Sequence, residues 1–466
     1  MRKRLILLLA LAVLSAAALP LLHSRVNQDQ DAVTLTETTL WGDPAAAQGM
    51  VVELVTHWND QLIWNTICRA GEEPVYETEF TFVPEGVDWP SEPSADSVWL
   101  QFATGNFGIS GGAIDLQEHA YDEDMLLRPV LDVAGRTADG ETRTETVPLL
   151  DYYDYYPAQL YLDGSDFWIL DSQESDQAMR DLVRTYFPVR VPEGATVTVT
   201  VTKDQWGNIT EVDSNEDQYV ETPYTVGAVT REGAWFALSI QSQAERDEVL
   251  VADDGEFPEG YGIYFLPLEE IDDDALQPVA EKFGLVYPLD PAQARVLELE
   301  LSPEGDRLLL FTQEGEELVL TVLDKETMEP VQRLPLPELS LDNGGVGLWQ
   351  APNYLLVYTG LTEFTLLTPE MDGSYDRWTT GSFAQVEEFW LSAYDRPELY
   401  FDGQRLAIAV PVHGGWTECD FLLGIWEQEG LAYMGRYDSS QTSDSGSWEE
   451  VRMADSAPLT LSWEGT

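Results

Sequence analysis

The chain has 466 residues, of which 44% are apolar, and its 84 acidic residues against 24 basic ones give a formal net charge of −60. Such a charge repels phosphate backbones and anionic lipid headgroups, so it disfavours nucleic acid and membrane surfaces as ligands and favours divalent cations and basic partners. Two cysteines, Cys68 and Cys419, are too few for a disulfide framework or a zinc site. We expect both to be free, buried thiols.

The N-terminus carries a signal for export. Basic residues at positions 2–4 precede the apolar run Leu5 to Leu22. Because eighteen residues are about the minimum for a helix that crosses the hydrocarbon layer, we expect residues 1–25 to form an uncleaved single-pass anchor in a bacterial cell membrane. Residues 26–32 would then be a tether, and 33–466 would lie outside the cytoplasm. Cleavage of the leader would instead give a secreted protein.

The first third of the chain predicts two sheets and a loop. Strands are expected at 33–40, 50–68 and 75–83, the second of these being a hairpin that turns at Trp58 to Gln61, and together they would form a first blade. A second unit is expected from 98–103, 125–133 and 142–150. The glycine-rich, acidic segment 105–124 between them is predicted to be a long loop.

The middle of the chain predicts one helix and two pairs of strands. Met179, Leu182, Val183 and Tyr186 follow the spacing of one helical face. A hairpin is expected from 196–202 and 209–212 around a polar turn at 204–208, and two further strands from 234–240 and 262–268.

The segment from Leu297 to Leu336 has the pattern of a propeller blade. It contains four short strands separated by three polar turns, and similar strands recur at 354–358 and 406–410. The sequence therefore predicts an all-β fold, a propeller of about seven blades behind the N-terminal helix. The last strand, 459–463, has no blade of its own, so we expect it to pair with the N-terminal strands and close the ring.

Within this segment the run SPEGDRLLLF and the run LVLTVLDKETMEPVQRLPL resemble the blade repeat of bacterial β-propellers of the YVTN and lactonase types. The chain as a whole is similar to an uncharacterised family of exported, membrane-anchored bacterial proteins. The resemblance implies a propeller fold, and it transfers no catalytic residue.

Catalytic motifs are sparse. Gly108 to Gly112 fits the G-x-S-x-G nucleophile pattern, with His119 or His413 as the base, but that pattern requires a strand-turn-helix elbow. We interpret the segment as a flexible loop. The four histidines are isolated, so metal-ligand spacing is absent and structural roles are expected for them.

Two weaker sites remain. Asp213, Asn215 and Asp217 have the alternating oxygen ligands of a calcium loop, although Gln218 and Tyr224 replace its glycine and its bidentate glutamate. The other interpretation is an ordinary solvated end of a hairpin, and we expect no cofactor besides calcium. The tyrosine-rich run 152–156 suggests either an aromatic platform for a sugar or peptide, or core packing.

The sequence thus predicts a monomeric, membrane-anchored propeller outside the cytoplasm. It would act as a binding scaffold for an unknown protein, peptide or glycan partner, without catalysis. The alternative is a propeller hydrolase, lactonase-like or glycan-cleaving, that uses channel carboxylates or a bound cation.

Overall fold

The structure is a computed structural model. The parts of the chain that it describes are 33–87, 97–103, 107–116, 126–164, 167–169, 173–216, 220–221, 224–239, 250–251, 259–272, 275–341, 345–359, 363–382, 397–412, 419–441, 451–454 and 458–464. They divide between two compact units, one made of 1–92 with 338–466 and the other of 93–337.

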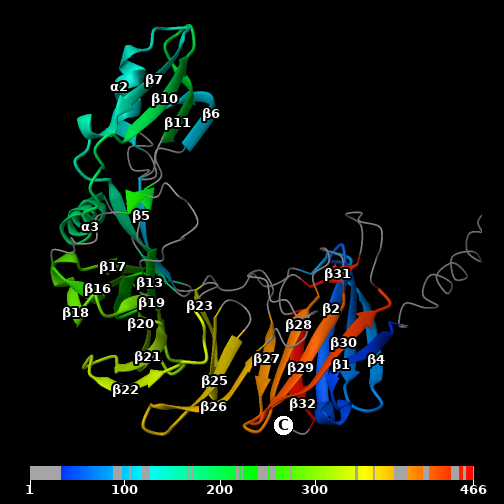
Figure 1. The fold of residues 1–466 in the computed structure, drawn as a ribbon. Helices are drawn as coiled ribbons and strands as arrows, with labels where there is room; N and C mark the ends of the chain where they lie inside the picture. Colours follow the sequence, from blue (N-terminus) through cyan, green and yellow to red (C-terminus); the bar gives the residue numbers. More distant parts are fainter. Residues whose placement is uncertain are drawn as a thin grey trace, which may run out of the picture. The chain divides into compact units, whose positions relative to one another are not determined.

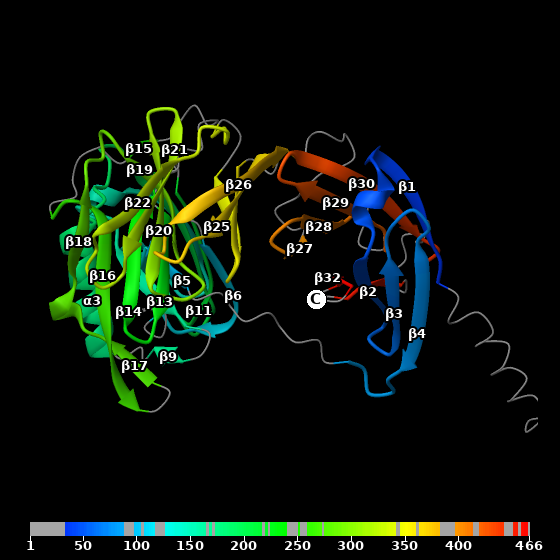
Figure 2. The same ribbon diagram turned by 90° about the horizontal axis from the view of Figure 1, so that it is seen from below.

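The first unit contains three antiparallel sheets (Figures 1 and 2). Consecutive strands pair in all three, as in propeller blades, and two of the sheets also include strands from the opposite end of the chain. The first consists of β23 (Val346–Ala351), β24 (Tyr354–Thr359), β25 (Glu363–Pro369) and β26 (Tyr375–Ser382). The second consists of β27 (Glu398–Phe401), β28 (Leu406–Pro411), β29 (Phe421–Glu427) and β30 (Gly430–Ser439), with β1 (Leu35–Gly42) at its edge. The third consists of β2 (Met50–Trp58), β3 (Leu62–Arg69) and β4 (Val75–Phe82), joined by β31 (Arg452–Met453) and β32 (Leu459–Trp463), while η1 (Pro44–Ala47) links β1 to β2.

Both ends of the chain are built into sheets formed by the opposite end. In β32, Leu459 lies opposite Leu54 and Trp463 lies opposite Met50, so the predicted pairing of the last strand with the N-terminal strands is confirmed. The expectation that 33–40 forms a blade with 50–83 is wrong, because β1 pairs with β30. A strand's alternation identifies its buried face but not its partner.

Two other predictions for this unit are confirmed. Asn59 and Asp60 both have positive φ, 55° and 57°, which is the geometry of a tight two-residue hairpin turn between β2 and β3. Cys68 and Cys419 are free and fully buried. Burial raises the pKa of each thiol to about 12.

The second unit contains the predicted blade of 297–336. Its central segment, Leu308 to Phe311, pairs with a strand on each side, and its side chains are buried on both faces of the sheet. The four strands are β19 (Arg295–Leu301), β20 (Arg307–Glu314), β21 (Glu317–Asp324) and β22 (Pro330–Pro335).

A larger sheet in the same unit includes the predicted strands at 234–240 and 262–268, which are neighbours. This sheet consists of β13 (Tyr224–Thr230), β14 (Gly233–Ser239), β16 (Tyr261–Asp272), β17 (Ala275–Pro278), β9 (Trp168–Ile169) and β18 (Gly284–Leu289).

The predicted helix is confirmed as α3 (Gln173–Tyr186), which buries Met179, Leu182 and Val183. Smaller elements are β5 (Ser97–Phe102) paired with β8 (Ala158–Asp163), β12 (Val220–Glu221) paired with β15 (Leu250–Val251), η3 (Leu149–Asp151) and η4 (Ala280–Lys282).

The remaining part of this unit is an α+β module in which one helix packs on a four-stranded sheet (Figure 1). Valines of the sheet and Val130, Val133 and Ala134 of the helix share one core. The sheet order is β6-β11-β10-β7. Its elements are β6 (Phe107–Ile114), α2 (Leu127–Arg136), β7 (Thr142–Pro148), β10 (Thr196–Lys203) and β11 (Ile209–Glu216).

The module corrects three expectations. The predicted strand at 125–133 is a helix from Leu127 onward, because its apolar residues recur at the spacing of a helical face. The predicted loop at 105–124 contains the strand β6, since a glycine-rich segment is tolerated at a sheet edge. The proposed second unit does not form, because β5 pairs with β8 whereas β7 joins the module.

The predicted anchor and tether lie outside the described residues, as do His23 and the rest of 1–32. Among the helices that the structure describes, none is long and apolar enough to cross a membrane. In the described residues the fold is all-β apart from α2 and α3, with sheets of the propeller-blade type, and the number of seven blades stays a prediction.

Candidate binding face

The sheet of the α+β module has one covered face and one open face. Along β10, Val197, Val199 and Val201 are fully buried and share a core with α2. Side chains of a strand alternate between faces, so Thr198, Thr200 and the threonines beside them point away from the helix. The sheet therefore presents a polar face to solvent.

Threonine hydroxyls are joined across two strands of this open face. The Oγ1 atoms of Thr142 and Thr202 are 3.0 Å apart, and those of Thr144 and Thr200 are also 3.0 Å apart. A third pair, Thr146 with Thr198, is separated by 2.8 Å. Because such cross-strand pairs fix both side chains, the hydroxyls form an ordered array.

Acidic and amide side chains continue the array onto β11. Glu211 lies opposite Thr202, Asp213 opposite Thr200 and Asn215 opposite Thr198. All three are exposed, and among the described residues no ion pair is found for the carboxylates of Glu211 and Asp213. Thr202 donates a hydrogen bond of 3.2 Å to Glu211. The open face therefore combines hydroxyl groups with carboxylates that lack a cationic partner in the described chain.

Two of the three predicted calcium ligands lie on this face. Asp213 and Asn215 belong to a strand that is paired on both sides, by β10 and by β6, rather than to a loop. Asp217 lies outside the described residues. Within the described chain no three His, Cys, Asp or Glu side chains gather as metal ligands do. The calcium site stays a prediction.

The turn between β10 and β11 is held by one aspartate. Asp204 Oδ1 accepts hydrogen bonds from the backbone N–H groups of Trp206 at 2.9 Å and Asn208 at 2.8 Å. Its Oδ2 accepts from Asn208 Nδ2 at 2.9 Å. These bonds, that from the Asn208 side chain above all, lower the pKa of Asp204. Gly207, with φ of 84°, completes the turn where a side chain would be strained.

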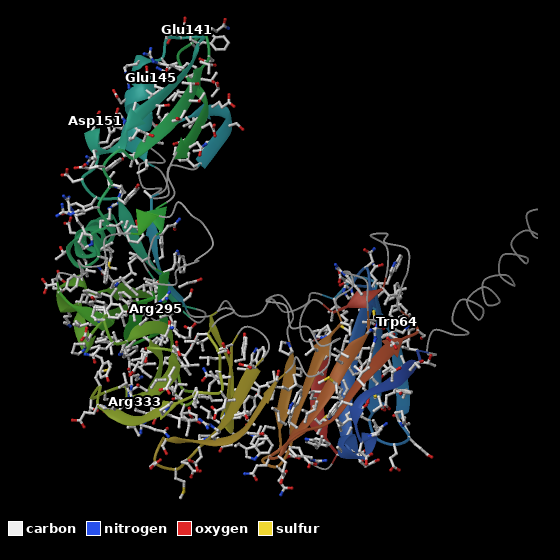
Figure 3. The ribbon with its side chains drawn as sticks, viewed as in Figure 1. Trp64, Glu141, Glu145, Asp151, Arg295 and Arg333 are labelled. Atoms are coloured by element: carbon white, nitrogen blue, oxygen red, sulfur yellow. The ribbon has the colours of Figure 1, made fainter. Side chains whose placement is uncertain are left out.

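The turn presents a large aromatic side chain to solvent. Trp206 is 75% exposed, more than the other exposed tryptophans of the described chain. Lys203 N–H donates to the carbonyl of Glu141 at 3.0 Å, and Gly140 N–H donates to the carbonyl of Asp204 at 2.8 Å. Glu141 marks this tip of the module in Figure 3. Tryptophan is enriched among the residues that contribute most of the binding energy at protein interfaces.

A groove opens at the same tip on the helix side of the sheet. Its volume is about 560 Å³, and its walls include Leu131, Ala134 and Ile209. Lys203 is the one cation in its lining, and its Nζ donates to the carbonyl of Thr137 at 3.1 Å. This contact satisfies a carbonyl at the C-terminal end of α2, which is a structural role.

The tyrosine-rich run supports α2. Tyr152 and Tyr153 pack against the core of the unit, and Tyr156 is buried. The hydroxyl of Tyr152 donates to Asp132 Oδ2 at 2.6 Å. The guanidinium of Arg128 lies 5.1 Å from the centre of the Tyr153 ring. The structure therefore places the run in core packing.

The serine of the G-x-S-x-G pattern has no nucleophile elbow. Ser110 lies in β6, extended and opposite Glu211. His119 and His413 lie outside the described residues. His57 is fully buried, with Nδ1 2.9 Å from Asp60 Oδ1 and Nε2 accepting from Arg452 Nε at 3.2 Å. Its contacts join the β2–β3 turn to β31, which is a structural role.

Two glutamates that we did not single out in the sequence have unusual protonation behaviour. Glu298 and Glu300 lie two residues apart on β19, so their side chains share one face. Burial raises the pKa of each to about 7. In the sequence these glutamates alternate with leucines. An ordinary solvated strand face shows the same alternation, so this pattern does not distinguish the two glutamates.

Comparisons with known proteins give no family. No described protein family matches the chain, and no curated protein matches it. A provisionally named 6-phosphogluconolactonase from Bacteroides fragilis shares 11% identity over 84% of this chain and 95% of its own, with a TM-score of 0.30. The periplasmic gluconolactonase of Pseudomonas aeruginosa shares 11% identity over 84% of each chain, with a TM-score of 0.26. Likenesses this weak carry no argument about activity.

Proposed function

We propose that this protein is a binding protein that recognises its partner through the open face of the α+β module and the turn that carries Trp206. The blades, about seven in number in this proposal, serve as the scaffold. We further propose that residues 1–25 anchor the chain in the membrane and leave 33–466 outside the cytoplasm, which is supported by the basic and apolar pattern of the leader.

The observation that carries the proposal is the exposure of Trp206 on an ordered turn. Burial of a tryptophan side chain stabilises a folded protein, so the free protein lacks that stabilisation when Trp206 is exposed. Asp204 nevertheless holds the backbone of the turn with three hydrogen bonds, so the side chain is carried on a fixed backbone. An aromatic side chain has only two χ angles, so it loses little conformational entropy on binding.

Site-specific photocross-linking tests the proposal. A photoreactive phenylalanine analogue at position 206, in the full-length chain expressed in its host cells, should give a discrete adduct. Combining it with Glu211→Gln and Asp213→Asn should remove the adduct. The same analogue at Trp41, which is 53% exposed in the other unit, is the matched control. Identical adducts at both positions, or an adduct that is insensitive to the two substitutions, would contradict the proposal.

A second candidate function is hydrolysis by the carboxylate pair of β19. A general acid must be protonated near neutral pH, and the raised pKa values of Glu298 and Glu300 meet this requirement. Because Glu298 and Glu300 are two residues apart in one strand, their Cα atoms are roughly 6.5 to 7 Å apart, and the two carboxyl groups are neighbours on one face. Assays of the purified chain against panels of lactones and glycans test this function. If the pair is catalytic, Glu298→Gln or Glu300→Gln should abolish any turnover that is found. Turnover that both variants retain would exclude the pair.

A further inference from the structure

The edge strand of the open face has features that select one kind of partner. Within the described chain β6 pairs on one side only, with β11, so its other edge offers unpaired backbone groups. The regular part of the pairing runs from Phe107 to Ser110. Gly111 and Gly112, with φ of 120° and 47°, then leave the extended conformation. An extended segment of a partner can pair with such an edge through main-chain hydrogen bonds.

A glycine leaves the path to the carboxylates clear. Gly108 lies directly opposite Asp213, and a Cβ built on Gly108 would be 3.5 Å from Asp213 Oδ1. The Asp213 carboxylate therefore lies beside the bare backbone of β6. A residue added next to Gly108 would have its Cα about 9.5 Å from that of Asp213, which is twice the spacing between strands. A lysine and an aspartate side chain together cross this distance when no side chain stands between them.

Charge selects the side chain of the partner. Glu211 and Asp213 have no cationic partner among the described residues, and the open face carries hydroxyl and amide groups besides. A net charge of −60 raises the local concentration of cations and steers basic segments toward the protein. Resting on the proposed function, we propose that the partner contributes an extended basic peptide segment, which pairs with β6 and places a lysine or arginine over Gly108 against Asp213.

A defined peptide tests this inference. The probe is a short, end-blocked peptide in which lysine alternates with valine, labelled with a fluorophore and titrated against the full-length chain in detergent. We expect saturable binding that weakens as salt is added, because exposed charge pairs are screened. A glutamate–valine peptide should not bind. A lysine–valine peptide with N-methylated backbone amides keeps the charge but cannot pair with the edge, and it should not bind either.

Two substitutions separate the contacts. Asp213→Asn should weaken binding by about five-fold, the upper range for an exposed ion pair. Gly108→Val should weaken it at least as much, because the valine side chain fills the path, and the backbone at Gly108 accepts a side chain without strain. Glu193→Gln, an equal change of charge at an exposed residue before β10, is the control and should bind like the wild type.

The outcomes distinguish this inference from the function on which it rests. Equal binding of the N-methylated peptide, or equal weakening by Glu193→Gln, would show attraction to net charge alone and would overturn the inference. If the peptide fails to bind while the cross-link at position 206 still depends on Glu211 and Asp213, the inference is wrong and the proposed function stands. Loss of both would overturn both.

Discussion

At the level of single residues, two glutamates predict how the stability of this protein depends on pH. Burial raises the pKa of Glu298 and of Glu300 to about 7, against 4.5 for an ordinary glutamate. A raised pKa means that the folded state binds protons more tightly than the unfolded state. The stabilisation is therefore complete below the unfolded value and is lost as pH rises through about 7.

This behaviour can be measured by urea unfolding. The midpoint for the wild type should fall between about pH 5 and pH 8. The double variant Glu298→Gln/Glu300→Gln should lose most of that slope, because neither amide titrates. Glu304→Gln, in the exposed turn after β19, should keep it. A slope that is the same in all three proteins would show that general charge repulsion, rather than this pair, controls the response.

Calcium binding at the predicted ligands is a second property of single residues. Asp213 and Asn215 lie on the open face, and a cation that binds only the folded state must raise its melting temperature. Addition of calcium chloride should therefore raise the melting temperature of the wild type but not that of Asp213→Asn. Magnesium at equal concentration serves as the control for ionic strength. No difference between the two proteins would rule out this site.

Among the elements, β32 makes the contribution that is easiest to isolate. Leu459, Leu461 and Trp463 are buried, and the guanidinium carbon of Arg405 lies 3.4 Å from the centre of the Trp463 ring. Asp402 holds Arg405 in place through its guanidinium at 3.2 Å. The strand therefore contributes apolar burial and a cation–π contact to the sheet of β2.

Removal of this strand should be costly. Truncation before Leu459 should lower the free energy of unfolding by several kcal/mol, since burial of each large side chain contributes roughly 1.5 to 3 kcal/mol. Truncation after Glu464 keeps the whole of β32 and should have little effect. Denaturant unfolding of both proteins provides the measurement, and equal midpoints would contradict the importance of the pairing.

The elements also show what could be predicted from sequence. Strands such as 297–301 and 196–202 were predictable because their alternation is local. The helix α2 was missed because it is only ten residues long, so the helical spacing of residues such as Val130 and Val133 repeats too few times to stand out from a short apolar run. The open face could not be predicted, since its array depends on the pairing of Thr200 with Thr144 across a gap of 56 residues. Trp206 was visible as a tryptophan within a polar turn, and that signal was overlooked.

At the scale of the whole molecule, the two units differ in how the chain builds them. The unit of 93–337 is continuous, whereas the other needs segments from both ends. Expressed alone, residues 93–337 should therefore show a cooperative thermal transition. Residues 33–92 alone should be unfolded, because β1 lacks β30 and β2 lacks β32, and they should fold on mixing with 338–466. Circular dichroism of the fragments checks this, and a folded 33–92 fragment would contradict it.

The orientation of the whole chain across the cell membrane can also be tested. Protease added to intact cells should degrade the chain and leave a short membrane-bound stub, because the basic residues 2–4 favour retention of the N-terminus inside. Detection of the stub requires an N-terminal epitope tag. Recovery of the intact chain from the cytosol would contradict the anchor.

The exchange of the two chain ends has a consequence for biosynthesis. Met50 and Trp463 are opposite each other in one sheet, yet translation at about 5 to 20 residues per second makes them roughly 20 to 80 seconds apart. During that interval β2 presents an unsatisfied edge, and an edge of this kind invites association with other nascent chains. The sheet of β2 can therefore be completed only after Leu459–Trp463 has been synthesised, long after β2 itself.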